Sequence, residues 1–197
     1  MNYSYDILVN LKNFAARSED VVIIGIDKHA FEKYDISSSG VIPRRVYAEL
    51  IEKVAQFKPA VLALDVIFER RISSGDDAGL ISSLASYPGP IVMSSTFQGS
   101  GAEETYIEPW KDIANDRLSH GYVNIFRGIR DDLDSIRRRY LPYEQFKKQI
   151  VYSLPLAVME KLGRVEINEV RGEIEFFKKP EEALRSKVKL HQGYCFI

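Results

Sequence analysis

The first half of the chain alternates between two patterns of apolar residues. Short, nearly unbroken apolar runs occupy residues 21–26, 60–68 and 91–97. Between them, apolar side chains recur at the three- and four-residue intervals of a helix, over residues 46–57 after Pro43 and from Asp76 or Asp77 to Tyr87. Short apolar runs are typical of strands buried on both faces. The order strand–helix–strand–helix–strand predicts an α/β fold, with a parallel or mostly parallel sheet covered by helices in three layers, α/β/α.

The second half predicts fewer and more varied elements. Residues 122–126 indicate a fourth strand, and residues 153–162 a helix with Pro155 in its first turn and Gly163 as its C-cap. Residues 165–170 and 173–177 alternate in polarity around Arg171-Gly172, which predicts a C-terminal antiparallel hairpin at a sheet edge or on the surface. Near the N-terminus, residues 5–17 have the spacing of an amphipathic helix.

Composition indicates an ordinary globular domain. The chain has 197 residues, of which 45% are apolar and 28% charged, so one domain over residues 1–197 is expected, with a core at about 6–163 and the hairpin and tail at 164–197. Lys and Arg number 27 against 28 Asp and Glu, which disfavours a nucleic-acid partner. No apolar run reaches the roughly 18–20 residues of a membrane span.

Motifs for the common cofactors and metals are missing from the sequence. The single cysteine, Cys195, excludes an internal disulfide and a cysteine-based zinc site. His29, His120 and His191 show no metal-ligand spacing, and no dinucleotide, phosphate-loop or nucleophile-elbow motif is found. We therefore expect neither a metal nor a cofactor, although Asp residues leave oxygen-ligand metals such as Mg²⁺ open.

Two aspartates in or at the end of apolar strands are the main candidates for chemistry. Asp27 and Asp65 could bind a metal or act as acid and base, or each could cap a loop or pair with an Arg such as Arg44. Asp65 lies within an apolar segment and needs a partner, so we expect Asp65→Ala to destabilise the fold. We expect Asp27, Arg44, Asp65 and Asn124 to converge at the strand ends. Asp76 and Asp77 indicate a helix N-cap.

Residues 131–139 are dense in both charges. We expect a turn stabilised by salt bridges among Asp132, Asp134 and Arg137. The neighbouring acidic residues disfavour a nucleic-acid contact. A pocket that binds an anion through one Arg is a further alternative.

In their order along the chain, these motifs resemble the CHASE2 family of extracytoplasmic sensor domains. The resemblance runs from about Asp6 to Leu162, with Ser135 where the family usually has Gly. The matching segments are residues 21–27; Pro43-Arg44; Asp65 with Ile67 and Phe68; Asp76-Asp77 with Leu80; Gly121 and Asn124; Asp132, Asp134 and residues 136–138; and residues 153–157.

The resemblance implies a periplasmic or extracellular ligand-sensing domain without catalysis of its own. It implies tethering through membrane segments absent from this chain and an output histidine kinase, nucleotide or diguanylate cyclase, or Ser/Thr kinase. The expected partners are an unknown small-molecule ligand, bound at Asp27, Arg44, Asp65 and Asn124, and a possible second copy in a homodimer. The alternative is a soluble Mg²⁺-dependent phosphohydrolase that uses the strand-end aspartates. Ser94, Ser95 and Thr96 at the end of the third strand keep this alternative open.

Overall fold

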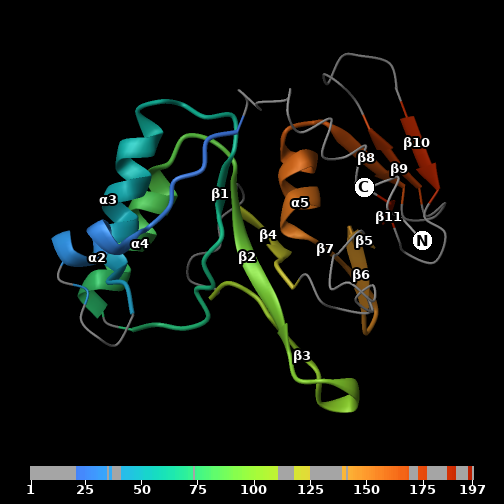
Figure 1. The fold of residues 1–197 in the computed structure, drawn as a ribbon, viewed down its shortest axis with the longest axis horizontal. Coiled ribbons are helices and arrows are strands. Elements are labelled where there is room, and N and C mark those ends of the chain that lie inside the picture. Colours follow the sequence, from blue (N-terminus) through green and yellow to red (C-terminus); the bar gives the residue numbers. More distant parts are fainter. Residues whose placement is uncertain are drawn as a thin grey trace. The chain divides into compact units, whose positions relative to one another are not determined.

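A computed structural model describes residues 21–34, 36, 41–72, 74–110, 118–124, 139–140, 142–168, 173–176, 186–189 and 195–196 (Figure 1). The chain divides into two compact units, Met1–Ile42 and Pro43–Ile197. No helix within the described ranges is both long and apolar enough to cross a membrane. The expected N-terminal helix at 5–17 lies outside these ranges.

The described part of the first unit contains one short helix, α2 (Lys28–Lys33). The strand expected at residues 21–26 is wrong for this structure, because residues 21–27 form neither helix nor strand. Val22 and Ile23 are 83% and 89% exposed. A strand needs a neighbour that pairs with its backbone, and the described residues of this unit contain no second strand. The β-branched sequence alone does not supply that partner.

The second unit is built on strand β2 (Ile91–Gln98), which is buried along seven of its eight residues. Strands β1 (Leu62–Leu64) and β4 (Leu118–Tyr122) both run parallel to β2 and both pair with residues 91–93, so they lie on its two opposite edges. Strand β3 (Thr105–Ile107), which follows the 3₁₀ turn η1 (Gly101–Glu103), pairs antiparallel with residues 96–98. The sheet is therefore mixed, with the expected parallel strands at its centre.

Within the described residues, the second unit also contains three helices. Helix α3 (Arg44–Ala55) packs on α4 (Ser74–Ser86), with Ile51, Leu80 and Leu84 almost fully buried. Helix α5 (Leu154–Lys161) packs on β4 and β2, and Ser153 is its N-cap. Pro155 lies in its first turn, as expected. The C-cap is Leu162 rather than the expected Gly163, which follows it with φ of 62°. The three-layer arrangement stays a prediction.

The remaining strands are antiparallel. Strands β8 (Val165–Asn168) and β9 (Glu173–Phe176) form the predicted hairpin, and β10 (Ser186–Lys189) adds a third strand to it. Strands β6 (Tyr143–Phe146) and β7 (Gln149–Tyr152) form a hairpin that the sequence did not indicate. Strand β5 (Arg139–Tyr140) pairs with β11 (Cys195–Phe196).

Several predicted boundaries are wrong. The strand expected at 60–68 is reduced to Leu62–Leu64, and the one expected at 122–126 ends at Tyr122 after beginning at Leu118. The sequence of β4, LSHGY, has weak strand propensity, and its pairing with β2 overrides that preference. Pro43 is the N-cap of α3 rather than its first residue.

We predict that Gly121→Ala destabilises the second unit by about 1–3 kcal/mol or more, because it overpacks a closed contact. A methyl group at Gly121 would lie 2.6 Å from the backbone nitrogen of Leu154 and 2.7 Å from its Cα. Thermal unfolding measures the loss.

Gly79→Ala in α4 is the matched control, because a methyl group there has no neighbour within 4 Å. We expect it to be neutral or to stabilise by up to about 1 kcal/mol. Equal melting temperatures for Gly121→Ala and the wild type would contradict the close approach of α5 to β4.

Candidate functional site

The carboxyl ends of the parallel strands bring Asp65 and Asn124 to the same end of the sheet, beside β2. In open α/β sheets, ligand sites gather outside this end. Asp65 follows the last residue of β1, and Asn124 comes two residues after β4. Each interacts with a different part of β2: Asp65 with Ser94, and Asn124 with Thr96 and Phe97. We call Asp65, Ser94, Thr96 and Asn124 the strand-end group.

Asp65 is exposed, so the expectation of a buried carboxylate is wrong. The apolar residues after it do not continue β1, and the chain leaves the sheet at Leu64. The carboxylate accepts a hydrogen bond of 3.0 Å from the Ser94 hydroxyl, which also lies 3.1 Å from the carbonyl oxygen of Leu64. Asp65 therefore retains an accessible carboxylate at the strand end.

Asn124 completes the backbone pairing of β2. The Phe97 N–H donates to its Oδ1 at 2.7 Å, and its Nδ2 donates to the Phe97 carbonyl at 3.1 Å. The Thr96 hydroxyl donates to the same Oδ1 at 3.1 Å. The side-chain amide thus takes the place of a peptide group beyond the last pair of β4. Both residues of the Gly121 and Asn124 motif therefore have a structural role. Gly121 allows the close approach of α5, and the Asn124 side chain extends the backbone hydrogen bonding of β2.

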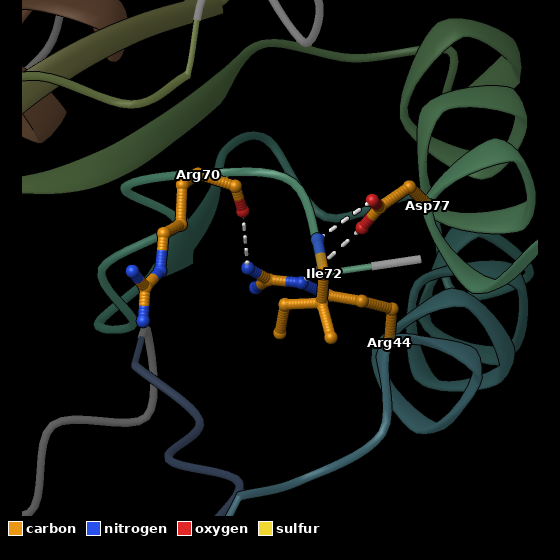
Figure 2. Close-up of polar contacts among 4 residues, drawn as sticks. All are labelled: Arg44, Arg70, Ile72 and Asp77. Carbon is orange, nitrogen blue, oxygen red and sulfur yellow. Dashed lines mark hydrogen bonds and ion pairs between the residues drawn. The ribbon is translucent and has the colours of Figure 1, made fainter. Parts of the chain in front are cut away.

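Arg44 pairs with Asp77, not with Asp65 as the sequence suggested. Its Nε lies 3.7 Å from Asp77 Oδ1, and its Nη2 donates to the Arg70 carbonyl at 3.1 Å (Figure 2). The other carboxylate oxygen of Asp77 accepts from the Ile72 N–H at 2.9 Å. The guanidinium also lies 4.4 Å from the centroid of the Phe68 ring. The pair therefore holds the loop 69–72 against the first turns of α3 and α4.

Both side chains of this pair are almost fully buried, at 7% and 3% exposure. Burial lowers the pKa of Arg44, while the negative charge of Asp77 and the nearby Tyr47 act in the opposite direction. Burial likewise raises the pKa of Tyr47, which Arg44 counteracts. Charges removed from water in this way must stay paired, so the Arg44–Asp77 pair specifies the local geometry more than it adds stability.

The other candidate residues have simpler roles or are not described. Asp27 is the N-cap of α2, where its carboxylate accepts from the Ala30 N–H at 3.0 Å. Asp76 and Asp77 are not N-caps, because α4 begins earlier, at Ser74, and both lie in its first turn. Asp132, Asp134 and Arg137 lie outside the described residues. Ligand contacts by Asp27, Arg44, Asp65 and Asn124 stay a prediction.

The sequence did not reveal a polar chain that crosses three strands. The Ser95 and Tyr106 hydroxyls are 2.6 Å apart, and the Tyr106 hydroxyl lies 3.0 Å from His120 Nδ1. His120 Nε2 lies 3.9 Å from a carboxylate oxygen of Glu108. Their spacing in the sequence carries no signal, because only strand pairing brings β2, β3 and β4 side by side. Among the described residues, no three His, Cys, Asp or Glu side chains form a group suited to a metal ion.

Comparison with known proteins identifies a family. The family model of the CHASE2 domain matches residues 2–193, essentially the whole chain. No curated protein and no solved structure matches the sequence.

We predict that Arg44→Met lowers the free energy of unfolding by about 3–5 kcal/mol, because it leaves the Asp77 carboxylate buried without its cation. The matched control is Arg45→Met on the neighbouring, exposed residue, which we expect to change stability by less than about 0.5 kcal/mol.

The double variant Arg44→Met with Asp77→Leu separates pairing from packing. It should be more stable than Arg44→Met, because no charge then stays buried. Additive losses in urea unfolding would contradict the pairing of these two residues.

We also predict that Asn124→Ala destabilises more than Asp65→Ala. Asn124→Ala leaves the Phe97 backbone without its side-chain partner, at a cost of about 1–3 kcal/mol. Asp65→Ala should cost less than about 1 kcal/mol, because the Ser94 hydroxyl keeps the Leu64 carbonyl as an acceptor. Thermal unfolding of both variants tests the order, and a larger loss for Asp65→Ala would reverse this account of the strand ends.

Proposed function

The chain belongs to the CHASE2 family, and we propose that it is the ligand-sensing domain of a membrane-bound signalling receptor. CHASE2 domains are extracytoplasmic sensor domains, and the match over residues 2–193 is the observation that carries the proposal. In this proposal the domain is periplasmic or extracellular and performs no catalysis. Its output is a histidine kinase, a nucleotide or diguanylate cyclase, or a Ser/Thr kinase in the same receptor.

The proposed ligand contact is at the strand-end group. Asp65 supports this position because its carboxylate is exposed and lies where open α/β sheets bind ligands. An accessible carboxylate favours a small molecule that carries hydrogen-bond donors or a positive charge. Asn124 and Ser94 hold the backbone around it, since their polar atoms are already bonded within the sheet.

The loop 69–72 is the proposed element through which occupancy is sensed. It lies between β1 and α4, and the Arg44–Asp77 pair binds its backbone at Arg70 and Ile72. A ligand changes the signalling state only if it binds two arrangements of the domain with different affinity. In this proposal the contacts of the loop to α3 and α4 hold one arrangement, and their release gives the other.

Sequencing the gene on both sides of this segment tests the receptor assignment. The proposal requires an apolar stretch of about 20 residues upstream and several downstream before a kinase or cyclase. A reading frame that starts near Met1 and stops near Ile197 would show that the proposed receptor does not exist.

Ligand contact is tested in the full-length receptor. We expect Asp65→Asn to abolish the thermal stabilisation by a ligand and the ligand-dependent change in output activity, with basal output retained. Glu49→Gln, which neutralises an exposed carboxylate in the middle of α3, is the matched control and should respond like the wild type. An unchanged response of Asp65→Asn would exclude Asp65 from the ligand contact.

A further inference from the structure

The polar chain of Ser95, Tyr106 and His120 links three strands by side-chain hydrogen bonds. Ser95 lies in β2 and is fully buried, Tyr106 lies in β3, and His120 lies in β4 and is one-third exposed. Strand β3 is short and pairs with β2 over three residues (Figure 1). The Phe97 and Phe146 rings pack against Tyr106, with centroids 4.8 and 6.0 Å away. These hydrogen bonds therefore attach β3 to β2 and β4 beside apolar rings.

The direction of these hydrogen bonds depends on the protonation state of His120. While His120 is neutral with Nδ1 as acceptor, Tyr106 donates to it and accepts from Ser95, so each hydroxyl in the chain is satisfied. When Nδ1 carries a proton, Tyr106 accepts from it, and the O–H proton of Tyr106 is left with the Ser95 oxygen as its acceptor. In the described structure, Tyr106 is the partner of the Ser95 hydroxyl. Once Tyr106 donates to Ser95, the proton of Ser95 has lost its acceptor, and Ser95 is fully buried.

We propose that Ser95, Tyr106 and His120 form a proton-responsive latch, which holds β3 against β2 while His120 is neutral and weakens this attachment when His120 is protonated. The latch depends on the sheet alone, so it stands or falls independently of the proposed ligand site. Its chemical signal is the proton, bound at the imidazole of His120.

Among the described residues, the acidic group that an ion-pair distance places beside His120 is Glu108, just after β3. An imidazolium would be drawn toward that carboxylate. Strand β2 carries no ionisable side chain. The first turn of α5, which meets β4 at Gly121, is uncharged, and its Glu160 and Lys161 lie at the far end of the helix. Strand β7, which also packs on β4, contributes Tyr152 as its only titratable group.

The electrostatic direction agrees with this geometry. Burial lowers the pKa of His120 below 6.5, and Glu108 only partly counteracts it. Burial also raises the pKa of Tyr106 to about 12, so Tyr106 stays a neutral hydroxyl in the chain. The pKa of His120 is therefore lower in the folded than in the unfolded chain. Neutral His120 contributes its full stability above pH 6.5, and this contribution is lost as the pH falls through and below that value.

An NMR pH titration of the whole chain tests the latch. We expect His120 to titrate below 6.5, and the backbone amide signals of Ser95 and Tyr106 to shift with the same midpoint. Tyr106→Phe removes the donor to Nδ1 and should raise the pKa of His120. In this variant the backbone amide signal of Ser95 should no longer shift when His120 titrates. Tyr122→Phe, which removes a hydroxyl of β4 that is not part of the latch, is the matched control and should leave the His120 pKa unchanged.

Thermal unfolding between about pH 7 and about pH 5 gives an independent readout. We expect His120→Gln to lose less stability over this range than the wild type, whereas His29→Gln should lose as much. If His120→Gln does not fold, the titration of the wild type still decides. A His120 titration midpoint at or above 6.5 would overturn the latch. So would backbone amide signals of Ser95 and Tyr106 that do not shift when His120 titrates.

Discussion

The second unit depends on one constraint: the backbone of a buried strand must be paired along its whole length. Strand β2 is buried over seven of its eight residues, so water cannot satisfy its N–H and C=O groups. Strands β1 and β4 pair with its first half, and β3 with its second half. Where β4 ends, the Asn124 side chain supplies both a donor and an acceptor to Phe97. The position of the strand-end group follows from this completed pairing.

The buried ion pair imposes a second, more local constraint. Arg44 and Asp77 come from the first turns of two helices and could not remain in a site of this burial without each other. Their remaining hydrogen-bonding atoms reach the backbone of the loop between β1 and α4. The loop conformation is therefore coupled to the spacing of α3 and α4. Such coupling is what a sensor domain requires if a local event is to change a larger arrangement.

The sheet combines two kinds of polar side chain at neighbouring positions of β2. Ser94 bonds toward Asp65 and the Leu64 carbonyl, and Ser95 bonds toward Tyr106 on the other face. The first contact leaves an accessible carboxylate at the strand end. The second joins a titratable imidazole to a buried hydroxyl. Alternation of side chains along a strand thus separates a proposed ligand contact from a proposed proton response.

Elements with strong local signals could be predicted from the sequence. The apolar run at 91–97, the amphipathic period of α3 and α4, and the proline and glycine of α5 were sufficient because each records burial or backbone geometry within a few residues. The ordered motifs were likewise sufficient to identify the CHASE2 family. Which residues contact one another depended on long-range pairing. It joined Arg44 to Asp77 instead of Asp65, exposed Asp65, made a strand of LSHGY, and left residues 21–27 without one. These outcomes depend on partners distant in sequence, since hydrogen bonding and charge pairing are properties of pairs, which no local pattern specifies.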